Sequence, residues 1–304
     1  MRSLTIAGGG TYNGTTGTTL ILNETGGYAW KNEETDGTGF VHNNGTVHVD
    51  FATGGGSGDT RVQELTLGNF KWTGAASSGE LWFSPPTGTT VTIAKDLTIH
   101  DGYCRPYSFS LANWVVTEDV LVESGGTLGN PNHTGDYSFG SLTINSGGKF
   151  QGTQGTTTLT GKESVSGTSF LNAGTFTHNN GKVKVTYGSA STQLTSAAFY
   201  DLEIATGTVS YIVNLYDPSS AINIYNNLTL TSGLLDIYMA DDTVDIHGLT
   251  NIASGARCWH SANDDTNMIT HHGLVTNYGT FKINDGTTVK LNGGIRQLGT
   301  LTIE

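Results

Sequence analysis

Residues 39–49 read Gly-Phe-Val-His-Asn-Asn-Gly-Thr-Val-His-Val, and a close copy, Gly-Thr-Phe-Thr-His-Asn-Asn-Gly-Lys-Val-Lys-Val, occupies residues 174–185. A more distant version, Gly-Thr-Phe-Lys-Ile-Asn-Asp-Gly-Thr-Thr-Val-Lys-Leu, occupies residues 279–291. In each copy apolar residues flank an Asn-Gly or Asp-Gly pair, which supplies the positive-φ turn that β-branched neighbours cannot adopt. We therefore predict strand–turn–strand units with the structural turn residues Asn43, Asn44, Gly45, Asn179, Asn180, Gly181, Asp285 and Gly286.

A shorter pattern also recurs: leucine, a polar residue, then isoleucine or leucine. It occurs at residues 4–6, 65–67, 97–99, 142–144, 202–204, 228–230 and 301–303. Successive side chains of a strand point to opposite faces, so each tripeptide predicts a three-residue strand with one buried face.

Larger blocks of the chain repeat as well. Residues 9–19 match residues 147–157 at an offset of 138. We therefore predict that residues 1 to about 140 and about 141 to 272 are one duplicated block, followed by a partial third block at 273–304. Because no Pro/Ser-rich linker interrupts the chain, we predict a single elongated domain over residues 1–304.

The composition predicts an all-β fold. The chain has 43 Gly, 48 Thr and 23 Asn, and its apolar residues alternate with period 2. One unit cannot bury its apolar face alone, whereas stacked units can, which favours a parallel β-helix or β-solenoid of about 11 coils. Crossover chirality predicts a right-handed winding. The alternative is an antiparallel β-sandwich array in which Asn44-Gly45 forms a hairpin turn.

Charge and hydropathy argue against several classes. The chain carries 14 Lys+Arg against 26 Asp+Glu, a net charge of −12 without a basic cluster, so we predict no nucleic-acid partner. No apolar run approaches the ~18 residues of a membrane span, so we predict no membrane insertion. The first six residues lack the apolar core of a secretory signal, so export would need another route, cell lysis or a longer precursor.

Cys104 and Cys258 are predicted to be buried small hydrophobes, with one long-range disulfide as the alternative.

A family resemblance can be stated on these motifs. The stretch at 174–183, followed by Phe-Tyr-Asp-Leu-Glu-Ile at 199–204, resembles the repeats of large phage virion proteins and of bacterial surface β-helix proteins. The resemblance extends over nearly the whole chain. It implies a role as a fibre, spike, decoration protein or adhesin, and it carries no catalytic motif.

Acidic pairs and histidines are candidate chemical sites. Asp241-Asp242 and Asp264-Asp265 are interpreted as turn residues, with a Ca²⁺ site or a catalytic pair as alternatives. His260 and His271-His272 flank the second pair, but no metal-binding spacing supports a site. We therefore predict no catalytic residues, no metal, no cofactor and no enzymatic activity.

Aromatic residues suggest a second kind of site. Trp30 and Trp82 lie in alternating aromatic stretches, which can stack on sugar rings when they share one face of a sheet. The same residues also fit a core, so glycan binding through these two tryptophans is kept as the alternative.

The leading functional hypothesis is structural. The chain opens at Leu4-Thr5-Ile6 and closes at Leu301-Thr302-Ile303, and neither end shows a helical or charged cap. Bare strand edges promote association, so we expect self-association or contact with other virion or fibre proteins through the solenoid ends. We predict a rigid β-solenoid component of a virion (tail fibre, spike or capsid decoration) or of an extracellular fibre, located in the virion or at the cell surface. A carbohydrate-binding adhesin is the alternative, and a β-helix polysaccharide lyase or hydrolase is less favoured.

Overall fold

The described part of the chain is all-β and its strands are parallel. The computed structural model describes residues 1–22, 27–32, 39–51, 59–63, 66–74, 80–83, 89–106, 113–164, 166–195, 198–216, 221–239, 243–262 and 268–304. Its strands stack as a β-solenoid with about 11 coils in all and, over these residues, no helix. The solenoid prediction is thereby confirmed, and the antiparallel alternative is wrong.

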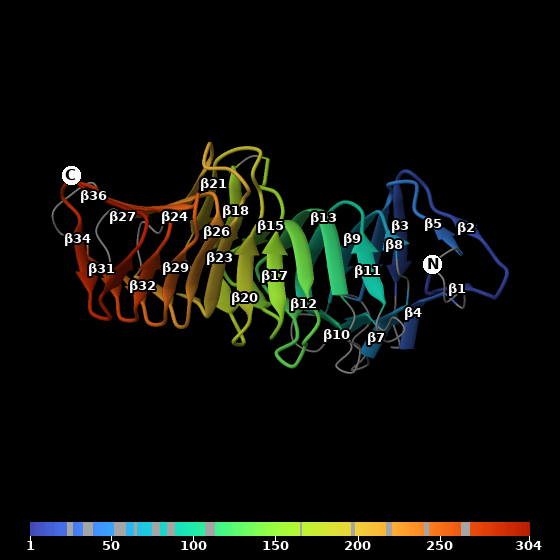
Figure 1. The fold of residues 1–304 in the computed structure, drawn as a ribbon. Helices are drawn as coiled ribbons and strands as arrows, with labels where there is room; N and C mark the ends of the chain where they lie inside the picture. Colours follow the sequence, from blue (N-terminus) through green and yellow to red (C-terminus); the bar gives the residue numbers. More distant parts are fainter. Residues whose placement is uncertain are drawn as a thin grey trace. The chain divides into compact units, whose positions relative to one another are not determined.

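The first of two compact units comprises Met1–Gly155 and Ala173–Asn179. Its strands have between two and ten residues and are seen side by side at the blue to green positions of Figure 1. They are β1 (Leu4–Ile6), β2 (Tyr12–Asn13), β3 (Thr18–Leu22), β4 (Gly27–Asn32), β5 (Phe40–Val41), β6 (Thr46–Asp50), β7 (Asp59–Val62), β8 (Thr66–Leu67), β9 (Asn69–Thr73), β10 (Glu80–Phe83), β11 (Thr90–Ile93), β12 (Leu97–Pro106), β13 (Asn113–Val122), β14 (Gly126–Gly129), β15 (Tyr137–Ile144), β16 (Lys149–Gln151) and β19 (Thr175–Thr177).

The second unit comprises Thr156–Asn172 and Asn180–Glu304. Its strands are β17 (Thr156–Leu159), β18 (Thr168–Asn172), β20 (Lys182–Val185), β21 (Thr192–Thr195), β22 (Ala198–Phe199), β23 (Asp201–Ala205), β24 (Ile212–Tyr216), β25 (Ile222–Ile224), β26 (Leu228–Ser232), β27 (Leu234–Met239), β28 (Thr243–Ile246), β29 (Thr250–Ile252), β30 (Arg257–Ala262), β31 (Met268–His271), β32 (Val275–Asn277), β33 (Thr280–Ile283), β34 (Thr288–Leu291), β35 (Ile295–Gln297) and β36 (Thr300–Ile303).

Leucines of three Leu-polar-Ile tripeptides, and of a related one at 228–230, lie in rows of buried side chains. In the first unit Leu97 pairs in register with Val120, which pairs with Leu142. In the second unit Leu202 pairs with Leu228. All of these side chains are buried, because each coil places its apolar residue over that of its neighbour. Burial of this apolar surface is the main stabilising contribution of a stack.

The turn at Asn43–Asn44 redirects the chain instead of reversing it. β5, before the turn, pairs in parallel with β2, whereas β6, after it, pairs in parallel with β3 and β9. The flanking strands therefore lie in different sheets. A hairpin would pair them with each other in antiparallel fashion.

The two repeat copies make the same contacts between coils. The rings of Tyr12 and Phe40 stack with centroids 6.0 Å apart, and the Phe150 and Phe176 rings at the matching positions stack at 5.7 Å. The duplicated pattern therefore corresponds to a duplicated packing arrangement. The single elongated domain over 1–304, the block boundaries and the right-handed winding stay predictions.

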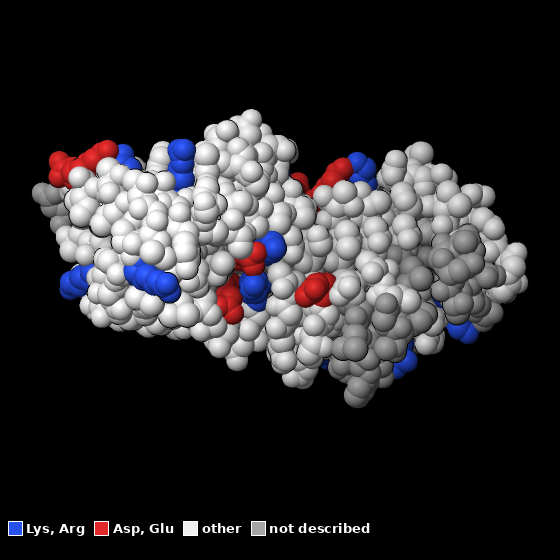
Figure 2. All heavy atoms as spheres, viewed as in Figure 1, with Lys and Arg blue, Asp and Glu red and all other residues white. Residues whose placement is uncertain are grey.

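Charged side chains are sparse on the surface. Figure 2 shows a face on which Lys, Arg, Asp and Glu are scattered among uncharged residues. This agrees with a charged fraction of only 13%. Stacked coils bring equivalent positions about 4.8 Å apart, so rows of like charge would repel.

Candidate functional site

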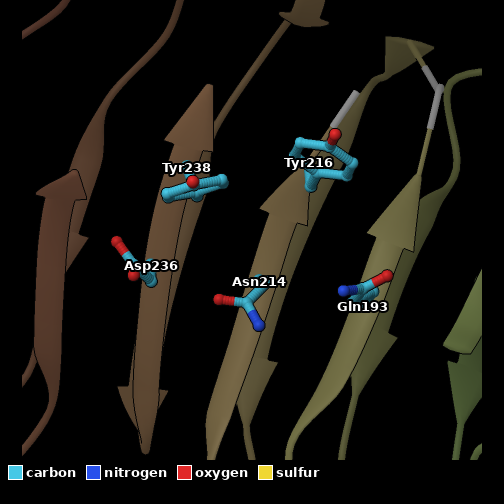
Figure 3. Close-up of a pocket in the computed structure, with 5 residues that line it drawn as sticks. All are labelled: Gln193, Asn214, Tyr216, Asp236 and Tyr238. Carbon is cyan, nitrogen blue, oxygen red and sulfur yellow. The ribbon is translucent and has the colours of Figure 1, made fainter. Parts of the chain in front are cut away.

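A hollow of about 320 Å³ opens on the sheet face of the second unit. It is lined by residues from three successive strands, β21, β24 and β27: Gln193, Asn214, Tyr216, Asp236 and Tyr238. Figure 3 shows Gln193, Asn214 and Asp236 in one row across the strands, and the rings of Tyr216 and Tyr238 in a second row beside it.

The parallel register places these side chains together. Gln193 pairs with Asn214, and Asn214 pairs with Asp236. Leu215 lies between Asn214 and Tyr216 in sequence, Ile237 lies between Asp236 and Tyr238, and both are buried. Since side chains alternate along a strand, burial of one set directs the polar residues and tyrosines outward. The tyrosines follow two positions after Asn214 and Asp236, and therefore share their face.

Asp236 has the most unusual environment in the hollow. Only 9% of the residue is exposed, and its Oδ1 is buried without a hydrogen-bond partner among the described residues. Burial raises the pKa of this carboxyl, while a hydrogen bond from Ser261 and the nearby charge of Lys282 act in the opposite direction. The Asn284 amide donates to Ser261 Oγ at 2.8 Å, which leaves the Ser261 hydroxyl proton free to point at Asp236. The carboxylate thus retains an unused acceptor oxygen.

The two tyrosines form a small aromatic surface. Their ring centroids lie 5.8 Å apart with a tilt of 38°. Both side chains are half-buried, so each ring leaves part of its surface open to solvent. Such rings combine an apolar face with a hydroxyl that can form hydrogen bonds.

The same row of positions continues beyond the hollow. Asp236 pairs with Trp259 on β30, and Trp259 pairs with Lys282 on β33. The Lys282 ammonium lies 5.7 Å from the centroid of a Trp259 ring, within cation–π range. A mixed aromatic and polar strip therefore extends over neighbouring coils of this unit.

The predicted turn residues of the first two repeats lie beside the strands they connect. Asn43 and Asn44 have φ angles of 47° and 58°, and Asn179 and Asn180 have 50° and 62°. The Asn43 side chain donates from Nδ2 to the Gly14 carbonyl at 2.7 Å, and Asn179 donates to the Gly152 carbonyl at 2.6 Å. These amides join each turn to the coil before it.

Gly45 of the motif does not supply the positive φ expected of it. The positive φ lies on the two asparagines and not on Gly45. A Cβ at Gly45 would lie 1.9 Å from the Thr15 carbonyl oxygen, so close approach of the coils is what requires glycine there. In the third repeat Gly286 itself has a φ of 77°, and Asp285 precedes it in the turn. Gly181 follows the second turn and leads into β20.

Trp30 and Trp82, the candidate residues for glycan stacking, lie in the first unit. Trp30 is 0% exposed and packs edge-on against Phe40 with centroids 4.5 Å apart, so neither face of its ring is open to a ligand. Trp82 is half-buried, and the Arg105 guanidinium lies over its ring at 3.9 Å. Glycan binding through these two tryptophans stays a prediction, and the half-buried rings of Tyr216 and Tyr238 are further candidates for such stacking.

Other predicted positions have plain outcomes. Asp241-Asp242 and Asp264-Asp265 lie outside the described residues. Cys104 and Cys258 are both free and buried, as first expected, and burial raises the pKa of each thiol. Among the residues that the structure describes, no group of three or more His, Cys, Asp or Glu is arranged to hold a metal ion.

His260 and His271 meet inside the second unit, where neither is exposed. Their Nε2 atoms lie 3.1 Å apart, and His260 Nδ1 lies 3.3 Å from the Lys282 carbonyl oxygen. A carbonyl only accepts, so His260 carries its proton on Nδ1 and accepts at Nε2 from His271 Nε2–H. His271 Nδ1 then accepts from the Thr250 hydroxyl at 2.8 Å. Every polar atom of the two neutral rings is thus satisfied.

Burial also disfavours the charged forms of these rings. It lowers the pKa of His260 to about 4. It likewise lowers the pKa of His271, to which His260 and His272 add like-charge repulsion.

Sequence reasoning missed the lining of the hollow. A signal was available, since Asn214-Leu215-Tyr216 and Asp236-Ile237-Tyr238 share the pattern polar, aliphatic, tyrosine. Only the coil-to-coil register shows that the two triplets are neighbours.

Comparisons with protein-family models, curated proteins and solved structures found no match. In the described part of the chain, no helix is long and apolar enough to cross a membrane.

Proposed function

We propose that this protein is a structural β-solenoid, a component of a virion or of an extracellular fibre, and that it catalyses no reaction. Its role would be to supply a repetitive surface built from stacked coils. The virion and the cell surface are the proposed locations.

One observation carries the proposal: the matched residues of the duplicated motif build contacts between coils. Asn43 and Asn179 bridge to the preceding coil through equivalent hydrogen bonds. The Tyr12–Phe40 and Phe150–Phe176 stacks repeat the same ring packing. Contacts that join neighbouring coils and occur in both copies of the motif support a role that depends on the stacked structure itself.

We further propose that another layer of polypeptide covers β36 in the assembly. Leu301 and Ile303 occupy the interior rows, in register with Phe281 and Ile283. Nevertheless, they are 39% and 70% exposed. Burial of such apolar surface favours association at about 25 cal/mol per Å². We propose that this layer is a second copy of the chain, with another virion or fibre protein as the alternative.

The decisive experiment is localisation in the native source. Large particles and filaments would be separated from free protein, identified by mass spectrometry and imaged by cryo-electron microscopy. We expect the chain at fixed stoichiometry in a particle, with density that fits stacked β coils. Recovery as free protein, or turnover of a polysaccharide by the purified chain, would overturn the proposal.

Self-association is tested separately by sedimentation of the full chain over a range of concentrations. Ile303→Lys is expected to weaken association, because it places a charge at an apolar contact. Thr288→Lys, at an exposed position of β34, is the matched control. A wild-type chain that stays monomeric, or an Ile303→Lys chain that associates as before, would exclude association through this coil.

A further inference from the structure

We propose that the hollow over β21, β24 and β27 binds a neutral glycan, with Tyr216 and Tyr238 as the stacking platform and Asp236, Asn214 and Gln193 as the polar contacts. This inference concerns a different part of the molecule from the coil-joining contacts that carry the structural proposal.

The first step is the aromatic platform. Tyr216 and Tyr238 come from neighbouring coils and present half-buried rings 5.8 Å apart on one face. Sugar rings expose C–H groups on their faces, and these groups pack against aromatic rings. The spacing of successive coils is comparable with the length of one sugar residue, so two rings on adjacent coils can contact successive residues of a chain.

The second step is the unused acceptor of Asp236. Its Oδ1 has no hydrogen-bond partner among the described residues, although the residue is 9% exposed and lines the hollow. Buried polar atoms normally have partners, and a lone acceptor costs free energy until a donor arrives. A sugar hydroxyl is such a donor, and because Oδ1 is itself buried, it would reach this oxygen once the Asp236 carboxylate turns toward the hollow. The amides of Asn214 and Gln193, in the same row, both donate and accept, as vicinal hydroxyls require.

The third step is charge. The five residues that line the hollow include one carboxylate and no cation, and Lys282, whose charge acts on Asp236, lies outside the hollow beyond Trp259. The whole chain carries a net charge of −12. An acidic polysaccharide would therefore be repelled, whereas a neutral one donates hydroxyl protons to the carboxylate without that repulsion.

The test uses the full chain and defined probes. Cellohexaose, laminarihexaose, maltohexaose and mannohexaose serve as neutral ligands, and oligogalacturonate serves as the acidic one. Binding is detected by saturation-transfer NMR and quantified by calorimetry. We expect at least one neutral hexaose to bind and oligogalacturonate not to bind. The proposal would be overturned if none of the four neutral hexaoses bound at about 10 mM, or if only the acidic probe bound.

Variants then locate the bound glycan. Tyr216→Ala and Tyr238→Ala are each expected to weaken binding about tenfold, because a stacking face is lost. Tyr216→Phe keeps that face and is expected to stay within about threefold of the original chain. Asp236→Asn keeps the shape but replaces an acceptor oxygen by an amide donor, for an expected loss of about fivefold.

Tyr225→Ala is the matched control, because Tyr225 is 49% exposed in the same unit and does not line the hollow. Circular dichroism establishes that each variant is folded. Equal losses in Tyr225→Ala and Tyr238→Ala, or no loss in either hollow variant, would place the glycan elsewhere and overturn the inference. The structural proposal is judged by localisation and is unaffected by that outcome.

Discussion

The interiors of the two units both contain aliphatic rows, but most of the large, fully buried aromatic rings belong to the first unit. In the first unit aromatic rings pack against one another in the core: the ring centroids of Phe83 and Trp114 lie 4.8 Å apart in an edge-on arrangement, and those of Trp114 and Tyr137 lie 6.0 Å apart with the rings tilted. In the second unit the rows are largely aliphatic, with Ile204, Leu230 and Ile252 in register. One coil of the second unit places two histidines, His260 and His271, inside.

The difference shows what a parallel stack requires of its core. The backbone register repeats regardless of whether an interior position holds an aromatic ring, an aliphatic chain or a hydrogen-bonded imidazole. The constraint is that each interior position be filled. The aromatic core meets this condition by volume, although Trp114 Nε1 is buried without a hydrogen-bond partner among the described residues. The histidine coil also pairs its ring nitrogens, through the tautomers of His260 and His271.

The largest expected effect tests the aromatic core. Trp114→Ala should lower the free energy of unfolding by about 3–5 kcal/mol, because it removes a fully buried ring and leaves a cavity. Guanidinium denaturation followed by circular dichroism measures the loss, and hydrogen exchange over residues 113–122 and 137–144 locates it. Leu20→Ala, at a residue that is 40% exposed, is the control and should change stability by about 0.5 kcal/mol or less. Similar losses in both variants would mean that the rings do not hold this unit together.

Acid should affect the histidine coil next most strongly. The pKa of His260 in the folded chain is about 4, below its ordinary value of 6.5, so the unfolded chain binds more protons between these values. Stability is therefore full above pH 6.5 and falls as the pH drops toward 4, by about 3 kcal/mol from this residue. Hydrogen exchange of residues 257–262 and 268–271 between pH 7 and 4 measures the change. The double variant His260→Leu/His271→Leu should lack it, and an unchanged pH profile in that variant would show that other groups are responsible.

A mutant cycle on the same pair should give a smaller effect. His271→Leu leaves His260 Nε2 as a buried acceptor without a donor, and His260→Leu leaves the His271 Nε2–H without an acceptor. Each single variant should lose about 1–3 kcal/mol, whereas the double variant, with an aliphatic pair, should recover most of it. Urea denaturation at pH 7.5 measures all four chains. Additive losses would show that the two imidazoles do not depend on each other.

The smallest effect concerns the turn asparagines, both of which belong to the first unit. Asn43→Gly removes the bond to Gly14 but tolerates the positive φ, at an expected cost of about 1 kcal/mol. Asn43→Ala adds the strain of a left-handed residue with a Cβ, for about 2 kcal/mol in total. Asn179→Gly and Asn179→Ala should repeat these values, measured by the same denaturation. If the aromatic core dominates this unit, all four losses stay below that of Trp114→Ala.

Much of the fold could be predicted from the sequence alone. The Leu-polar-Ile tripeptides predicted short strands with one buried face, and repetition of these weak units predicted stacking. The buried state of Cys104 and Cys258 also followed from composition. Within the turn motif, however, the roles were exchanged: Asn43 and Asn44 adopt the positive φ, and Gly45 is needed because the preceding coil passes close to its Cα. Local conformational preference favours glycine at positions of positive φ, but it does not take into account how closely a neighbouring coil approaches.

The candidate site was harder to predict from the sequence, because its residues come together only through the register between coils. Trp30 and Trp82 stood out because aromatic residues cluster around them, but clustering along the chain marks the core as readily as a surface. Asn214, Asp236, Tyr216 and Tyr238 are individually ordinary, and they become a site only when β24 and β27 lie in register.

By itself, the sequence determined the strand-forming alternation, the positions of the turns and the need for stacking, because each of these follows from a few neighbouring residues and the burial they demand. The tertiary structure alone decided which coil lies on which, and so which side chains meet across coils. That choice depends on the summed packing of many residues, and it is what joined His260 to His271 and set two tyrosines beside a carboxylate on one exposed face.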